Sequence, residues 1–167
     1  MIRRVAFGKA VIAGVAGAAA WEAVARLFIL LGAPMFDIVR VLGTMLLGLG
    51  APTWEWWPAG LAMHAVIGAI WAIFYAYFVW SFFDLRPIFQ GLLFSLLPAL
   101  LAGVIMVPQM DLMLDGQYPP FRIFAIGIGV FGPISIFIGH IIYGLVMGSI
   151  YMRPVGHRVG SYKINYG

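Results

Sequence analysis

The chain has 167 residues, of which 63% are hydrophobic and 10% charged, with a mean hydropathy of +1.01, a balance far outside that of a soluble globular domain. Its apolar runs reach the roughly 20 residues that a membrane helix needs, and no run alternates apolar and polar residues as barrel strands do. We therefore expect an all-α integral membrane protein with one domain over residues 1–167. The absence of cysteine excludes thiolate chemistry, and the net charge of +4 gives no reason to expect nucleic acid as a partner.

Four segments are apolar enough to cross the bilayer. Hydropathy places them at residues 5–31, 57–83, 88–106 and 132–152. Residues 36–47 are too apolar for a solvated loop, and the glycines and prolines around them argue against a fifth span, so we expect a short interfacial helix after the first span. An Asp-Gly turn at residues 115 and 116 and a Pro-Pro stop mark the connection between the third and fourth spans.

The basic residues predict the orientation of the spans. Arginine and lysine gather before the first span, in the link between the second and third, and after the fourth, whereas Arg40 and Arg122 lie on the other side. The positive-inside rule then places both termini in the cytoplasm, with residues 153–167 as a cytoplasmic tail. The first 20 residues also fit a signal peptide, with MIRR as the charged start and AGAAAW as a cleavage site. The internal repeat argues against that alternative, because this segment is a full member of it.

The chain divides into two similar halves. Residues 17–37, GAAAWEAVARLFILLGAPMFD, align with residues 91–111, GLLFSLLPALLAGVIMVPQMD, and both end in Pro-x-x-Asp. Further along each half, His64 and His140 begin the pattern HxxxGxxxxxxY. We infer two parallel two-helix repeats, at about residues 5–83 and 84–152. Each repeat has an even number of spans, so both histidines are expected at a similar depth.

Both histidines share a helical face with small residues. At about 100° per residue, His64 lies on one face with Gly68, and His140 lies on one face with Gly144 and Gly148. Small residues four apart allow membrane helices to approach closely, and the second set is a literal GxxxG. We therefore expect both histidines in the packed interior and away from lipid.

Four stretches of this sequence resemble a widespread family of small four-helix membrane proteins of bacteria and archaea that has no established activity. They are MFDIVRVLGTML, HAVIGAIWAIFY, GLLFSLLPALLAGVIMVP and HIIYGLVMGSIY. The resemblance covers about residues 14–151. It implies the four-span topology, the paired histidines and a prokaryotic cytoplasmic membrane as the location.

Charged residues within the spans are costly and call for an explanation. Glu22 and Arg26 lie four apart on the first span, so we expect them to pair on one face, with a proton-relay role for Glu22 as the alternative. Asp37 and Asp111 each follow proline by three residues. They are expected to cap the short helix that follows, by accepting N–H bonds from its first turn.

The two histidines leave three interpretations open. The favoured one is structural: each neutral ring hydrogen-bonds across the bundle, to Tyr143, to a backbone carbonyl or toward the side of the two aspartates. His64 and His140 could instead ligate a b-type haem or contact a pigment or quinone, since bis-histidine ligation uses two imidazoles at one depth. A metal ion would need further ligands, and the carboxylates lie nearer the outer interface.

We expect a non-catalytic accessory subunit of a larger membrane complex, namely a respiratory, photosynthetic or other oxidoreductase assembly. Its partners would be the lipid bilayer, larger membrane subunits and, for some functions, a second copy of the chain. No motif for hydrolysis, phosphoryl transfer or metalloprotease chemistry is present, so catalysis is not expected. The alternatives are an electron-transfer subunit that holds haem b, a pigment or a quinone through the histidine pair, and a small repeat-built transporter that acts as an oligomer.

Overall fold

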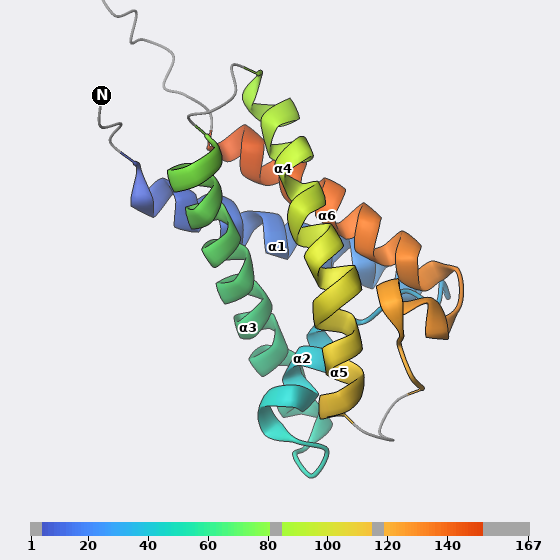
Figure 1. Ribbon diagram of the computed structural model, residues 1–167. Helices are drawn as coiled ribbons and strands as arrows, with labels where there is room; N and C mark the ends of the chain where they lie inside the picture. The colour runs from blue at the N-terminus through green and yellow to red at the C-terminus, as the bar shows by residue number, and fades with distance from the viewer. Residues whose placement is uncertain (1–4, 81–84, 115–118, 152–167) are drawn as a thin grey trace, which may run out of the picture.

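The computed structural model describes residues 5–80, 85–114 and 119–151, and the regular elements within them are all helical. Four helices are long and apolar enough to cross a membrane (Figure 1). They are α1 (Phe7–Leu30); α3 (Thr53–Phe74) with the π-helical turn η1 (Tyr75–Val79); α4 (Pro87–Leu101) with the π-helical turn η2 (Ala102–Met106) and α5 (Val107–Met113); and α6 (Phe131–Ile150). Two shorter helices lie in the connections, α2 (Ile38–Leu47) and the 3₁₀ helix η3 (Ile123–Ile128).

The four predicted spans are confirmed as helices, although their ends differ from the prediction. α3 begins at Thr53, directly after Pro52, and the third span continues to Met113 instead of ending at residue 106. η2 lies between Pro98 and Pro108, and the wider π-helical turn is one way in which a helix absorbs the backbone bonds that proline removes. Residues 81–83 and 152 of the predicted spans, and the predicted tail at 153–167, lie outside the described residues.

α1 packs against α3 at a point where glycines from both helices meet. A Cβ atom on Gly14 would overlap the carbonyl oxygen of Gly68, and one on Gly68 would lie 2.7 Å from the carbonyl oxygen of Gly14. Membrane helices approach this closely only where side chains are absent from the contact. Tyr143 of α6 reaches the same place, where its hydroxyl donates a hydrogen bond to the carbonyl oxygen of Gly68 at 2.7 Å.

α4 packs against α6 in the same manner. A Cβ atom on Gly91 would overlap the carbonyl oxygen of Gly144, and one on Gly148 would lie 2.6 Å from the carbonyl oxygen of Pro87. The glycine that follows each histidine by four residues is therefore a backbone contact in both halves. The sequence alignment pairs Gly91 with Gly17, whereas the glycine that makes the corresponding contact on α1 is Gly14, about one helical turn earlier.

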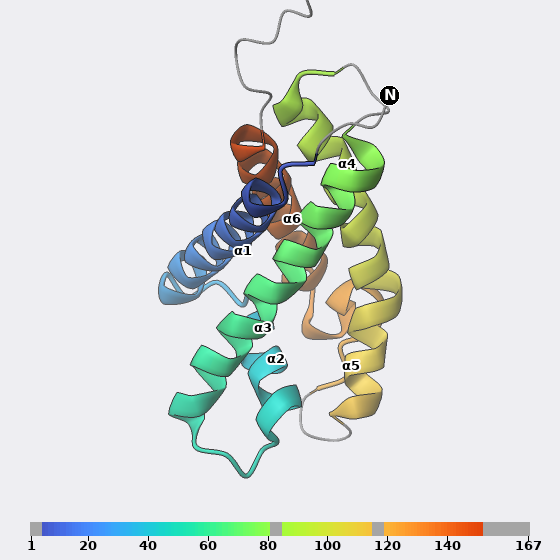
Figure 2. The ribbon, with the colours of Figure 1, turned by 90° about the vertical axis from the view of Figure 1, so that its left-hand side faces the viewer.

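The helix pairs are not equivalent around the bundle. α1 lies against both α3 and α6, and α4 lies against α6, but α3 and α4 are not packed against each other along most of their length. Figure 1 shows α1 and α6 behind α3 and the continuous helix α4–α5, and Figure 2 shows the same arrangement from the side. The two-repeat arrangement itself stays a prediction, and this packing departs from strict twofold symmetry.

Two hydrophobic clusters fill the two ends of the bundle. The α2 cluster joins α2, α5, η3 and α6, with Leu42, Met110 and Ile136 among its buried members. The tyrosine cluster, at the other end, contains Tyr75 and Tyr151, whose ring centroids are 5.8 Å apart. The middle of the bundle lies between these clusters.

The predicted helix after the first span is present as α2. Its buried face packs against α3, where a Cβ atom on Gly43 would overlap the backbone of Trp56 and one on Gly60 would overlap that of Val39. α2 thus lies tightly against the beginning of α3. Its expected position at the membrane interface stays a prediction.

Gly14→Ala is expected to destabilise the protein, because the new methyl group meets the backbone of α3 and not a movable side chain. Overpacking of this kind costs roughly 1–3 kcal/mol. Gly8→Ala is the matched control on the same helix, since a Cβ atom there has nothing within 4 Å. Thermal unfolding in detergent should show a lower midpoint for Gly14→Ala and an equal or higher midpoint for Gly8→Ala. Equal midpoints for the two variants would contradict the close contact.

Candidate functional site

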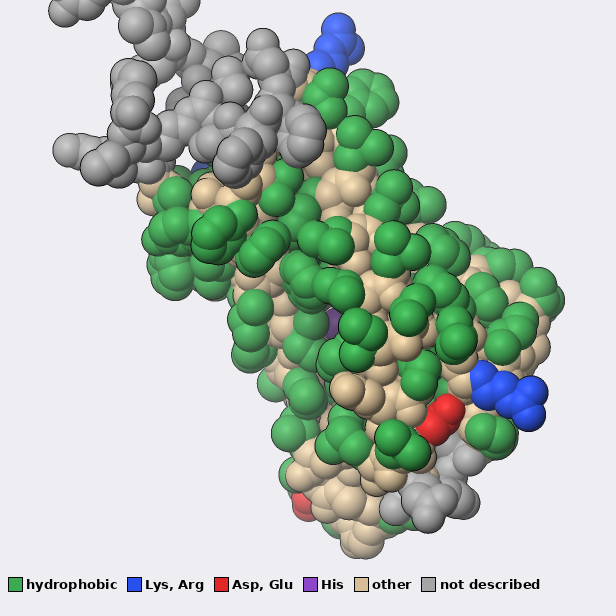
Figure 3. Space-filling model, viewed as in Figure 1, with side chains coloured by type: hydrophobic (Ala, Val, Ile, Leu, Met, Phe, Trp, Pro, Cys, Tyr) green, Lys and Arg blue, Asp and Glu red, His purple; other side chains and the backbone are tan. Residues whose placement is uncertain are grey.

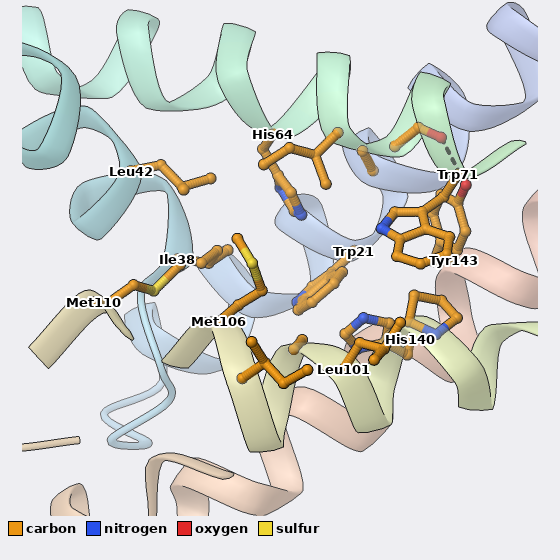
Figure 4. Close-up of a pocket in the computed structure, with 16 residues that line it drawn as sticks. Trp21, Ile38, Leu42, His64, Trp71, Leu101, Met106, Met110, His140 and Tyr143 are labelled. Carbon is orange, nitrogen blue, oxygen red and sulfur yellow. Dashed lines mark hydrogen bonds between the residues drawn. The ribbon is translucent and has the colours of Figure 1, made fainter. Parts of the chain in front are cut away.

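A cavity of about 300 Å³ lies in the middle of the bundle, between the α2 cluster and the tyrosine cluster. Helices from all four spans and α2 contribute to this central cavity, whose wall is mostly apolar. Two histidines, two tryptophans and a tyrosine supply its polar atoms (Figure 4). The lining residues are Ala18, Trp21, Ile38, Leu42, His64, Ile67, Gly68, Trp71, Pro98, Leu101, Ala102, Ile105, Met106, Met110, His140 and Tyr143.

Both predicted histidines line the cavity, and each of them contacts the same tryptophan. The ring centroid of Trp21 is 4.9 Å from that of His64 and 4.6 Å from that of His140, and Figure 4 shows the indole between the two imidazoles. The histidines are only 5% and 6% exposed, so the prediction that they face the packed interior is confirmed. Both imidazoles contact one indole ring, and their similar depth in a membrane stays a prediction.

The hydrogen bonds of the histidines differ from the expected ones. His140 bonds through Nδ1 to the carbonyl oxygen of Ile136 on its own helix, at 2.8 Å, and not across the bundle. A carbonyl oxygen only accepts, so Nδ1 carries the proton and the neutral ring presents Nε2 as an acceptor. His64 has a buried Nδ1 with no hydrogen-bond partner among the described residues. A buried polar atom left unpaired costs roughly 1–3 kcal/mol, so this atom calls for an explanation.

Trp21 is the central residue that the sequence prediction missed. Gly14, Ala18 and Trp21 follow one another at helical spacing on α1, so the indole lies on the face that packs against α3. Gly139, immediately before His140, makes room for it, because a Cβ atom there would overlap the indole ring. A lone large aromatic residue at this spacing from glycine and alanine was the available signal.

The wall of the cavity has an opening on one side, between α3 and the third span. α3 and α4 meet near the tyrosine cluster, where the rings of Trp71 and Phe94 lie 6.1 Å apart and Gln90 Nε2 donates to the carbonyl oxygen of Val79 at 3.1 Å. At the other end, α2 packs against α5. Between these two contacts α3 is separated from α4 and η2, and Figure 3 shows a histidine side chain in the opening there. This lateral opening is bordered by Ile67, Trp71, Leu101, Ile105 and Met106.

Glu22, Arg26 and Asp37 form an ionic network beside the cavity. Arg26 donates through Nε to Glu22 and through a terminal nitrogen to Asp37, and its guanidinium lies 5.8 Å from the ring centroid of Trp57. The predicted pairing of Glu22 with Arg26 is therefore confirmed, and the network also reaches α2 and α3. Glu22 is 4% exposed, and its Oε2 has no hydrogen-bond partner among the described residues.

The two aspartates that the repeat aligns have different roles. Asp37 is the N-cap of α2, where its side chain accepts a hydrogen bond from the Arg40 N–H at 3.0 Å. The expected helix cap at Asp111 is wrong, because α5 runs to Met113 and places Asp111 inside a helix. Its carboxylate accepts the N–H groups of Phe121 and Arg122, at 2.5 and 2.8 Å, and so ties the segment before η3 to α5.

The histidine pair does not form a ready metal or haem site. Bis-histidine ligation requires two imidazole nitrogens to face one iron, and here the Trp21 indole lies against both rings. A porphyrin bound by both histidines would displace that indole. Among the residues that the structure describes, no group of three or more His, Cys, Asp or Glu side chains is placed to hold a metal ion. The arrangement is suited to holding a neutral molecule by packing and hydrogen bonds.

Arg26→Met is expected to destabilise the protein strongly, because it leaves two carboxylates without their shared cation. Glu22 is buried while Arg26 and Asp37 are partly exposed, so the cost is that of leaving one buried acceptor unsatisfied, about 1–3 kcal/mol. Adding Glu22→Gln to this variant should restore part of the loss, since it removes the more deeply buried charge. Thermal unfolding of the single and double variants measures the difference. A double variant that is less stable than Arg26→Met alone would contradict this assignment.

Comparison with protein-family models, with curated proteins and with solved structures finds no match for this chain. The family resemblance therefore rests on the sequence motifs alone, and the site is interpreted from its own geometry.

Proposed function

We propose that the chain is a non-catalytic integral-membrane subunit that holds a small apolar ligand in the middle of its helix bundle. The observation that carries this proposal is the central cavity, with its apolar wall and its histidine pair. Binding sites for small molecules are typically concave and apolar with a few placed polar groups, and volumes of about 300 Å³ or more are common.

The position of the cavity supports binding over a purely structural role. Packed membrane bundles bring small residues together and close their interior, as this chain does at Gly14 and Gly68 and at Gly91 and Gly144. The same chain leaves its centre open and lines it with aromatic rings. A subunit with this interior fits the expected accessory role in a larger membrane complex, including an oxidoreductase assembly, where bound lipids and pigments are part of the architecture.

The two alternative functions receive less support from the geometry. A haem would compete with Trp21 for the space between the imidazoles. A transporter needs a route to both aqueous faces, and the α2 cluster and the tyrosine cluster fill the two ends of the bundle. Binding without transport is the simpler use of the cavity.

The proposal includes the orientation of the chain in the membrane, the position of α2 and the origin of the two helix pairs. Both termini lie in the cytoplasm, as the distribution of arginine and lysine indicates, and α2 lies at the opposite membrane interface. The membrane is a prokaryotic cytoplasmic membrane, as the family resemblance implies. In both helix pairs the close contact is made by the glycine that follows the histidine by four residues, Gly68 and Gly144, which supports an origin of the two pairs in a duplicated unit.

Ala102→Phe tests the proposed ligand. Ala102 lines the cavity from η2, so a phenyl group there fills space that the ligand needs, while Val104→Phe is the matched control because Val104 lies outside the lining and is 50% exposed. Wild type and both variants are purified in mild detergent, and bound small molecules are extracted and identified by mass spectrometry. We expect a molecule in about one copy per chain in wild type and Val104→Phe, and at least tenfold less in Ala102→Phe.

The same purification tests the accessory role. A membrane subunit that co-migrates in a fixed ratio with the wild-type chain supports it, and a chain that migrates alone from native membranes argues against it. Equal ligand content in all three proteins, or no extractable molecule in any of them, would overturn the binding proposal.

A further inference from the structure

The central cavity is closed along the membrane normal and open to one side. The α2 cluster lies between it and one end of the bundle, and the tyrosine cluster lies between it and the other. The lateral opening between α3 and η2 is bordered by apolar side chains, of which Ile105 is 45% exposed and Met106 is 41% exposed. In a membrane this flank faces the acyl chains, because the apolar surface around it belongs to two spanning helices. A molecule that reaches the cavity by this route arrives from the bilayer.

The part of the ligand that enters the cavity has to be uncharged. No Asp, Glu, Lys or Arg side chain is among the lining residues. A carboxylate or phosphate headgroup would be left unpaired in an apolar space, which is strongly unfavourable. Free fatty acids and phospholipid headgroups are therefore poor occupants.

The wall also favours a flat head with hydrogen-bonding oxygens. Trp21, Trp71 and Tyr143 present rings to the cavity, and offset or edge contacts between rings stabilise a planar ligand. His140 presents Nε2 as an acceptor, and His64 has no hydrogen bond to a described residue that fixes its tautomer. His64 can therefore donate an N–H group to a carbonyl oxygen of the ligand, and His140 can accept a hydrogen bond from a hydroxyl group.

We infer that the central cavity takes the head of a neutral, ring-headed membrane lipid of the quinone class, which enters from the bilayer through the lateral opening between α3 and η2. The ring lies in contact with Trp21, and its hydrocarbon chain leaves through the lateral opening. A carbonyl oxygen of the ring accepts a hydrogen bond from an N–H group of His64, and a hydroxyl group of the reduced, quinol form donates one to Nε2 of His140. This inference rests on the proposed binding function and names the class of ligand. It concerns binding alone and requires no redox step.

The test uses the full chain in nanodiscs of synthetic phosphatidylcholine, which contain no quinone. Decylubiquinone is the probe, and two molecules with alkyl chains of similar length are the comparisons: decylbenzene, which has a ring without oxygens, and decanoate, which has a charged head. Retention beyond that of empty nanodiscs is measured by extraction and chromatography. We expect saturable binding of decylubiquinone, at least tenfold weaker binding of decylbenzene and no binding of decanoate.

Variants assign the polar contacts. His64→Leu removes the N–H donor for a quinone carbonyl oxygen, and loss of one hydrogen bond corresponds to about tenfold weaker decylubiquinone binding. His140→Leu removes an acceptor nitrogen that only a hydroxyl group can use, so it should weaken binding of the reduced probe, decylubiquinol, about tenfold and binding of decylubiquinone much less. Val104→Phe, outside the lining, should bind as wild type does. Helical content and thermal unfolding are measured for each variant. The ligand comparison in wild type decides the class even if a histidine variant fails to fold.

The possible results distinguish failure of the quinone class from failure of the proposed ligand-binding function. Decylbenzene bound as tightly as decylubiquinone, or a preference for decanoate, would overturn the quinone class and leave a general binding function standing. A folded His64→Leu variant that binds decylubiquinone unchanged, or a folded His140→Leu variant that binds decylubiquinol unchanged, would overturn the role of that imidazole. Saturable binding of none of the three molecules overturns this inference, and the molecule extracted from native membranes then decides the proposed function separately.

Discussion

The direct contact of helix backbones at two glycine pairs determines how this bundle is built. Gly14 meets Gly68 and Gly91 meets Gly144, at distances that leave no space for a side chain. These contacts fix α1 on α3 and α4 on α6. Because α1 also packs on α6, the two pairs are joined at the back, and α3 and α4 are left apart at the front. The central cavity and its lateral opening are consequences of this asymmetric packing.

The ionic network of Glu22, Arg26 and Asp37 stabilises one end of the central cavity. Trp21 and Glu22 are neighbours in sequence, so one turn of α1 presents an indole to the cavity and a carboxylate to Arg26. Arg26 also pairs with Asp37, the residue that caps α2. α2 in turn contributes Ile38 and Leu42 to the cavity wall. The ionic network therefore holds in place the helix that closes one end of the cavity, which gives its charges a structural role that needs no proton relay.

Features governed by local sequence were predictable. Hydropathy located four spans, helical periodicity placed both histidines on an interior face, and the spacing of four between Glu22 and Arg26 indicated their pairing. The features that were predicted wrongly, the end of the third span and the role of Asp111, depend on contacts between distant parts of the chain. Because the third span continues past residue 106, Asp111 lies inside a helix and does not cap one. Its carboxylate accepts a hydrogen bond from the N–H group of Phe121, ten residues further along the chain.

The cavity itself could not be read from the sequence. It depends on which helix pairs are in contact, and the two-repeat pattern predicts equal packing on both sides where the structure has unequal packing. Trp21 was overlooked for a related reason. The spacing of Trp21 from Gly14 and Ala18 places the indole on the packed face of α1, but its contact with one ring from α3 and one from α6 depends on how those helices pack.

The claim on which the account depends is that the cavity opens to lipid and not to water. The chain has no cysteine, so Ala102→Cys carries a nitroxide spin label at a unique position in the cavity wall. Power saturation in lipid vesicles compares relaxation of the label by oxygen, which concentrates in the bilayer, with relaxation by a water-soluble nickel chelate. The account predicts strong relaxation by oxygen and little by nickel, close to the values at a label on Val104→Cys. Strong relaxation by the nickel chelate would show a cavity connected to water and contradict it.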